Sequence, residues 1–184
     1  GEGYRRLWLT PIEFEVLDLA TVKFAKVDLP RALPADSVTG AGRNWTISDM
    51  VVIDNELFVA GLSNEEFSST VRRVPIPFGS NIATIGLRMY HTHHHRYETQ
   101  SPVTAFAAYK RFDRKYLIAA YGCTPVVLFP IDSLQDGAKV TGTTIAELGA
   151  GNNIGDTVPL SCDGRSCVVF APRRRSLQML DATF

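Results

Sequence analysis

All four histidines of the chain fall within five positions, at His91, His93, His94 and His95. In an extended segment, successive side chains alternate between two faces, so His91, His93 and His95 point to the same side. Three imidazoles on one face can bind Zn²⁺ or Cu²⁺ through neutral ring nitrogens. Glu98 could add a fourth ligand or accept a hydrogen bond that fixes a histidine tautomer. The sequence therefore predicts a candidate copper or zinc site at His91, His93, His95 and Glu98.

The same histidines also fit a polar, exposed loop in which they form only hydrogen bonds, and this is the more common role of such loops. The sequence leaves both interpretations open. Ser101 and Ser161 do not stand in a Gly-x-Ser-x-Gly elbow, and the glycine-rich 149–153 segment lacks the lysine of a phosphate-binding loop. An enzymatic interpretation therefore depends on the histidine segment alone.

The segments around the histidines are predicted to be β-strands. Residues 102–134 contain three runs rich in Val, Ile, Tyr and Phe, separated by short polar turns, which is typical of antiparallel strands. Residues 47–78 and 155–184 follow the same three-strand plan. The first set of predicted strands is Val103–Lys110, Lys115–Gly122 and Pro125–Ile131, and a fourth strand is predicted at Ile85–Tyr90 and again at Lys139–Leu148.

These strands recur as a repeat. Its copies start near Ile47, Val103 and Gly155, which gives offsets of 56 and 52 residues. No segment shows a 3.6-residue apolar period, so we expect little helix. Four antiparallel strands repeated at about 40 to 55 residues are typical of β-propeller blades, each of which buries its two apolar faces against its neighbours.

From Ile47 onward the repeats resemble those of bacterial β-propellers of the loose YVTN/NHL kind. The resemblance implies an all-β fold, a β-propeller segment made of four-stranded antiparallel blades, two complete and two partial. The complete blades are placed at 44–92 and 100–148, and the partial blades at 1–40 and 152–184. Propellers have at least about four blades. Either the two partial blades close one blade together, or the chain belongs to a larger ring, and the resemblance then implies a partner, either a second copy or another propeller-forming segment. Apolar residues including Val168, Val169, Phe170 and Leu177 are expected on the unpartnered face at one end.

In propellers, ligands usually bind where the outer strand of one blade connects to the inner strand of the next. Those connectors are predicted at Ala41–Thr46, His91–Pro102 and Gly149–Asp156. We therefore expect a binding or assembly module that presents a polar, histidine-rich face to a ligand or protein partner. The alternative is a copper- or zinc-dependent, or quinoprotein-like, oxidoreductase centred on the histidines. The predicted ligand-binding residues are Arg43, Asn44, Trp45, Arg96, Tyr97, Asn152 and Asn153.

The composition and the positions of the cysteines limit the possible functions and the cellular location. Lys plus Arg and Asp plus Glu number 19 each, so the chain lacks the basic excess expected of a nucleic-acid binder. No apolar run approaches the roughly 20 residues of a membrane span. Cys162 and Cys167 flank a predicted hairpin turn and could form a disulfide or stay reduced, with Cys123 then unpaired. A disulfide would place the protein in an oxidising, extracytoplasmic compartment, periplasmic or secreted.

Overall fold

The computed structural model describes residues 28–30, 45–122, 124–149, 151–162 and 165–181. Most of the predicted partial blade 1–40 lies outside these ranges, as do Arg43 and Asn44. The described residues form thirteen β-strands, and no α-helix occurs among them. The predicted all-β class is therefore confirmed.

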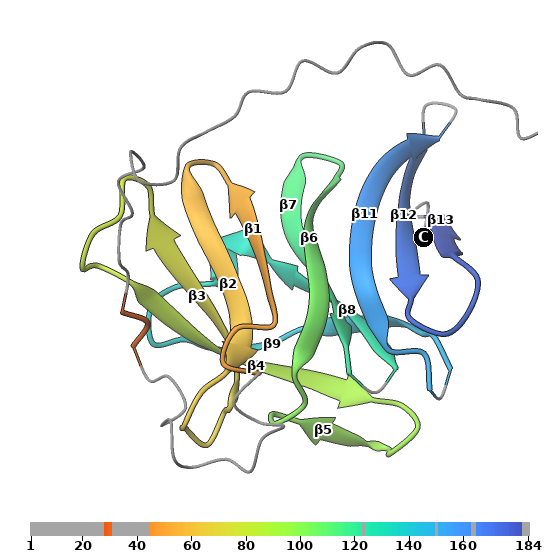
Figure 1. The fold of residues 1–184 in the computed structure, drawn as a ribbon, viewed down its shortest axis with the longest axis horizontal. Helices are drawn as coiled ribbons and strands as arrows, with labels where there is room; N and C mark the ends of the chain where they lie inside the picture. Colours follow the sequence, from red (N-terminus) through yellow and green to blue (C-terminus); the bar gives the residue numbers. More distant parts are fainter. Residues whose placement is uncertain (1–27, 31–44, 123, 150, 163–164, 182–184) are drawn as a thin grey trace, which may run out of the picture.

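The strands form three sheets that stand side by side (Figure 1). The first sheet has the order β1-β2-β3-β4-β5, all antiparallel, and β9 joins β4 in parallel. Its strands are β1 (Asp49–Ile53), β2 (Glu56–Leu62), β3 (Ser69–Pro75), β4 (Ala83–His91), β5 (Arg96–Glu98) and β9 (Lys139–Thr141).

The second and third sheets are antiparallel meanders. The second has the order β10-β8-β7-β6, with β6 (Val103–Arg111), β7 (Arg114–Tyr121), β8 (Pro125–Pro130) and β10 (Thr143–Glu147). A three-residue 3-10 turn, η3 (Ile131–Ser133), follows β8. The third sheet has the order β11-β12-β13, with β11 (Ile154–Cys162), β12 (Arg165–Pro172) and β13 (Gln178–Asp181).

The second sheet is buried on both faces, which explains its long apolar runs. On one face of β7, Leu117, Ala119 and Tyr121 pack into the core shared with the first sheet. On the other face, Ile118 and Ala120 pack into the core shared with the third sheet. Successive residues of one strand therefore enter different cores, and the sequence YLIAAY satisfies both.

The predicted fourth strand Lys139–Leu148 is divided at Gly142. Its first part is β9, which pairs with β4 of the first sheet, and its second part is β10, which pairs with β8 of the second. The Gly142 N–H donates to Arg88 O at 2.9 Å. A Cβ at Gly142 would collide with Val127 and with the ring of Phe129, so the chain can pass this close to the second sheet only with glycine.

The predicted connector His91–Pro102 also contains strand structure. Its first residue ends β4, and a four-residue turn at 92–95 leads into β5, which pairs back on β4. His95 has a φ of 52°, in the left-handed region, and its N–H donates to Thr92 O at 3.2 Å. The segment is therefore a hairpin and not one extended run.

Candidate metal site and connector pocket

His91 occupies a core position at the end of β4. In this strand Leu87, Met89 and His91 alternate with more exposed residues and all point inward. The His91 side chain is completely buried. A buried imidazole needs partners for both ring nitrogens, because unpaired buried polar groups are costly.

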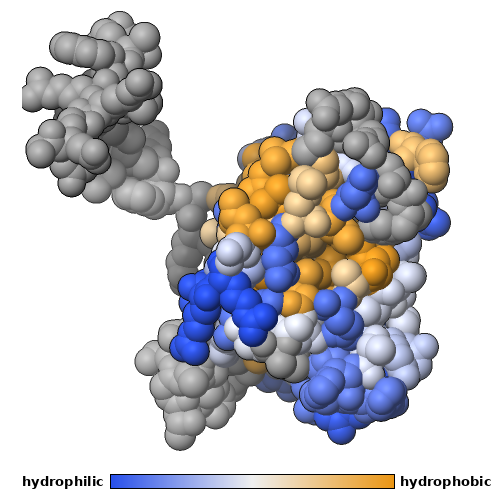
Figure 2. All heavy atoms as spheres, turned by 90° about the vertical axis from the view of Figure 1, so that its right-hand side faces the viewer, coloured by the Kyte–Doolittle hydropathy of each residue, from blue (hydrophilic) through white to orange (hydrophobic). Residues whose placement is uncertain are grey.

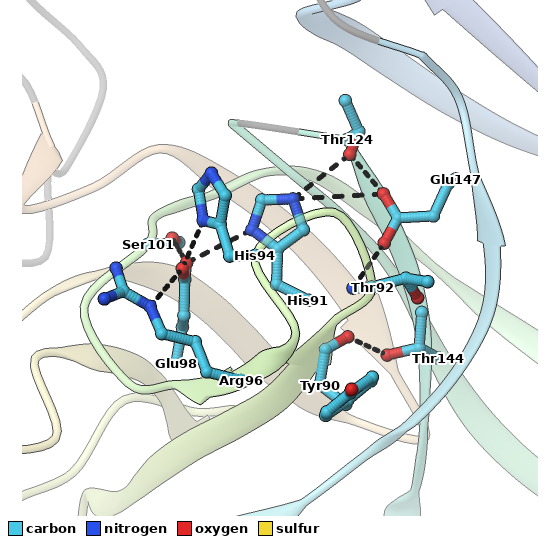
Figure 3. A network of polar contacts seen from close by, with 10 residues as sticks. All are labelled: Tyr90, His91, Thr92, His94, Arg96, Glu98, Ser101, Thr124, Thr144 and Glu147. Carbon is cyan, nitrogen blue, oxygen red and sulfur yellow. Dashed lines mark hydrogen bonds and ion pairs between the residues drawn. The ribbon is translucent and has the colours of Figure 1, made fainter.

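The hairpin brings His94 and Glu98 onto one side of this imidazole (Figure 3). The ring centroids of His91 and His94 are 4.0 Å apart. His94 Nδ1 lies 2.6 Å from Glu98 Oε1, and His91 Nδ1 lies 3.4 Å from Glu98 Oε2. One donor atom from each of the three residues lies within 4.8 Å of the others. The turn thus creates a convergent group of two imidazoles and one carboxylate.

Glu98 is held as a carboxylate. Its burial alone would raise its pKa, but hydrogen bonds from His94, Ser101 and Arg96 outweigh the burial and lower the pKa to about 2. Ser101 Oγ donates to Oε2 at 2.9 Å, and Arg96 Nε donates to Oε1 at 3.1 Å. A fixed negative charge therefore faces both imidazoles over the ordinary pH range.

The other ring nitrogen of His91, Nε2, contacts a residue at the edge of the second sheet. His91 Nε2 lies 3.3 Å from Thr124 Oγ1, and the Thr124 hydroxyl donates to Glu147 Oε2. Glu147 Oε1 also accepts the Thr92 N–H at 2.9 Å. A carboxylate can only accept, so the hydroxyl gives its proton to Glu147 and accepts one from His91 Nε2. This network assigns the neutral ring its proton on Nε2 and leaves the lone pair on Nδ1.

That lone pair faces another acceptor. His91 Nδ1 makes no hydrogen bond to the described residues, although Glu98 Oε2 is the nearest carboxylate oxygen, at 3.4 Å. Two acceptors at this distance repel unless a cation lies between them. A second proton on the ring satisfies this requirement, and so does a metal ion bound by both atoms and by His94. In metal sites, the ring nitrogen of a histidine that does not bind the metal usually donates its proton toward a carboxylate. Here His91 Nε2 is connected in this way to Glu147 through the Thr124 hydroxyl.

The histidines that converge differ from those predicted. His91 and Glu98 belong to the group, but its third member is His94, because the 92–95 segment is a turn and does not alternate as a strand does. His93 and His95 are exposed and lie outside the group, and the His93 ring centroid is 6.4 Å from that of His91. The predicted side-by-side arrangement of His91, His93 and His95 is therefore replaced by a different set.

A groove adjoins the group. It has a volume of about 550 Å³ and is lined by His94 and by the continuous segment Arg96–Pro102. The predicted ligand residues Arg96 and Tyr97 lie on its wall. Volumes of roughly 300 to 1,000 Å³ are usual for small-molecule sites. A molecule bound in this groove would therefore reach the exposed side of His94.

A second pocket joins the three predicted connectors. It has a volume of about 290 Å³ and is lined by residues of all three connectors, among them Trp45, Pro102 and Asn153. Arg173 also lines it, and its guanidinium forms no hydrogen bond or ion pair with the described residues. Thr104, Gly122 and Ile154 complete the wall. Asn152 precedes Asn153 in sequence but does not line this pocket. Its side chain is buried, and the side-chain nitrogen donates to Leu148 O.

Sequence reasoning missed Thr124, Glu147, His94 and Arg173. Thr124 immediately precedes β8 and Glu147 ends β10, both more than 30 residues from His91, and no local spacing connects them to it. Cys167 takes part in a disulfide. The side chains of Cys123 and Cys162 lie outside the described residues, so the Cys162–Cys167 pairing and the extracytoplasmic location stay predictions.

Comparisons with known proteins identified no relative of the chain. No family model matches the chain, and neither the curated proteins nor the solved structures contain a significant match. In the described ranges, no helix is both long and apolar enough to span a membrane.

Proposed function

We propose that the chain is a segment of a β-propeller that works as a ligand-binding module, with a divalent metal ion, zinc or copper, at His91, His94 and Glu98. The observation that carries this proposal is the unpaired His91 Nδ1 facing the Glu98 carboxylate. The propeller arrangement is supported by two antiparallel sets of four strands, β1 to β4 and β6, β7, β8 and β10, and by the contacts of β6 with both β1 and β11.

The donor set suits zinc first. Zinc takes imidazole nitrogens and carboxylate oxygens at about 2.0 to 2.2 Å, and two histidines with one glutamate leave the fourth position of a tetrahedron open. His91 is fixed from both sheets, whereas the His94 side chain is 40% exposed and can rotate toward the ion. A ligand in the adjoining groove, which His94 lines, could then complete the coordination with a carboxylate or another anionic donor.

Isothermal titration of the metal-free chain with zinc chloride, and separately with copper sulfate, tests this proposal. We expect one ion per chain, and a loss of at least tenfold in affinity for His94→Ala and Glu98→Gln. His93→Ala and His95→Asn are the matched controls, because both residues are on the same turn, and asparagine tolerates the left-handed backbone of position 95.

The proposal fails if the unaltered chain binds neither metal, or if the two control variants lose as much affinity as His94→Ala. Circular dichroism and thermal unfolding of each variant separate loss of the site from loss of the fold.

A second ligand site is supported at the connector pocket. Arg173 supplies a positive charge without a partner among the described residues, Asn153 supplies an amide, and Trp45 with Ile154 supplies apolar walls. This combination fits a small organic acid with one apolar face. Arg173→Gln should abolish the quenching of Trp45 fluorescence by such an acid, whereas Arg174→Gln, an exposed neighbour, should not; equal effects of both variants would contradict this assignment.

A further inference from the structure

The outer face of the third sheet is apolar and exposed. Val158 of β11, Val169 of β12 and Met179 of β13 are cross-strand partners, so their side chains form one row on that face. Val158 is 42% exposed, Leu160 47% and Met179 65%. Figure 2 looks onto the side of the molecule where this sheet lies, and hydrophobic residues gather over much of it.

The opposite face of the same sheet is buried. Val168 and Phe170 point into the core shared with the second sheet. The sequence-based expectation that these two residues would lie on the unpartnered face is therefore wrong, because adjacent residues of β12 point to opposite sides. Val169 lies on the outer face as expected, and Leu177, just before β13, is 72% exposed.

The first sheet has a matching exposed edge at the other end of the stack. In β1, Val51 and Ile53 face the core shared with the second sheet, and Met50 and Val52 face away from it. Met50 is 55% exposed and Val52 60%. The two ends of the stack thus each present aliphatic side chains from the first strand of a sheet.

Within the chain, the first strands of successive sheets pack against one another. β1 contacts β6, and β6 contacts β11. Asp49 of β1 also accepts the Phe106 N–H of β6 at 2.8 Å. The strand β6 therefore has a first strand on each side, whereas the outer sides of β1 and β11 have none among the described residues.

We infer that a second copy of this chain supplies the missing neighbour, with β11 of one copy packed against β1 of the other. This contact would continue the series β1, β6, β11 across the two molecules. A two-fold axis makes the second contact identical to the first, so two copies close a ring of six sheets without leaving either end open. The inference rests on the stacking of sheets in the proposed function and is independent of the metal.

Analytical ultracentrifugation tests this arrangement with three variants. The unaltered chain should sediment as a dimer, at twice its 20.3 kDa. Leu160→Glu on β11 and Val52→Glu on β1 should each give a monomer, because each places a charge in both copies of the contact. Phe112→Glu is the control, since Phe112 is 85% exposed in the turn between β6 and β7 and should not affect the dimer.

Mixing the two monomeric variants tests the head-to-tail contact directly. In the mixture, one contact joins an unaltered β11 to an unaltered β1, so dimers should return at higher protein concentration. A mixture that stays monomeric would overturn the head-to-tail arrangement.

A monomeric unaltered chain would overturn the inference and indicate that another segment or protein covers these faces. A dimer that withstands either Leu160→Glu or Val52→Glu would overturn it as well. Zinc titration of the same variants keeps the two proposals apart, because the metal group lies within one chain and should bind equally in monomer and dimer.

Discussion

His91 Nδ1 lies 3.4 Å from Glu98 Oε2, and no hydrogen bond joins the two atoms. The ring is held in place from its other side by Thr124, and the carboxylate by Ser101 and Arg96. Neither group can therefore turn away without losing its own partners. The pair is therefore a preformed place for a positive charge.

The first prediction concerns acid stability. The folded-state pKa of Glu98, about 2, is below the ordinary 4.5, so its contribution to the free energy of unfolding is complete above pH 4.5 and is lost as pH falls toward 2. Glu98→Gln should remove this contribution, and its stability should fall less over that interval. Urea unfolding at a series of pH values measures the difference.

Glu66→Gln provides the control for this measurement, because the Glu66 side chain is 85% exposed. Its pH profile should follow that of the unaltered chain. If Glu98→Gln loses as much stability between pH 4.5 and 2 as the unaltered chain does, the hydrogen bonds to Glu98 do not stabilise the carboxylate.

The second prediction concerns Thr124, the hydrogen-bond partner of His91 next to β8. Thr124→Val removes the acceptor of the Nε2 proton and so releases the ring to its other tautomer. Loss of such a partner typically lowers metal affinity about 10- to 100-fold, and the same loss is expected for zinc here. Thr144→Val is the matched control, because Thr144 donates to Tyr90 O and does not contact His91. Equal losses in both titrations would show that the tautomer is not fixed by Thr124.

The third prediction concerns Gly61 on β2. A Cβ at this position would collide with the backbone carbonyl of Thr46, so the 45–46 segment must shift. Overpacking of this kind typically costs about 1 to 3 kcal/mol, and Gly61→Ala should destabilise the chain by this amount in urea unfolding. Gly79→Ala is the control, because its Cβ would meet only Pro75, at 4.0 Å. A neutral Gly61→Ala would mean that Trp45 and Thr46 are not held against the sheet.

Much of the fold could be predicted from local pattern. The run ELFVAGL coincides with β2, and the runs after Pro102 match β6, β7 and β8 to within one residue at every end. The division of Lys139–Leu148 could not be predicted, because the apolar pattern continues through Gly142. Only the approach of Val127 and Phe129, which come from another strand, makes the glycine necessary.

The site was predictable only where its residues are neighbours in sequence. The histidine cluster identified His91 and Glu98, but the choice between His93 and His94 depends on the positive φ of His95, which reverses the chain. Histidine does not signal such a conformation as strongly as glycine does. Thr124 and Glu147 contact His91 only through the packing of two sheets, and a single polar residue at the end of an apolar strand has many roles.

The path of the chain from Lys139 to Glu147 also has a consequence for local unfolding. This stretch is hydrogen-bonded into the first sheet as β9 and into the second as β10, so it ties the two sheets together by backbone hydrogen bonds. The third sheet follows through a single connection after Leu148 and has no strand in either neighbour among the described residues. We therefore expect the first two sheets to behave as one cooperative unit, with amide protons that exchange together, and the third sheet to open separately from them.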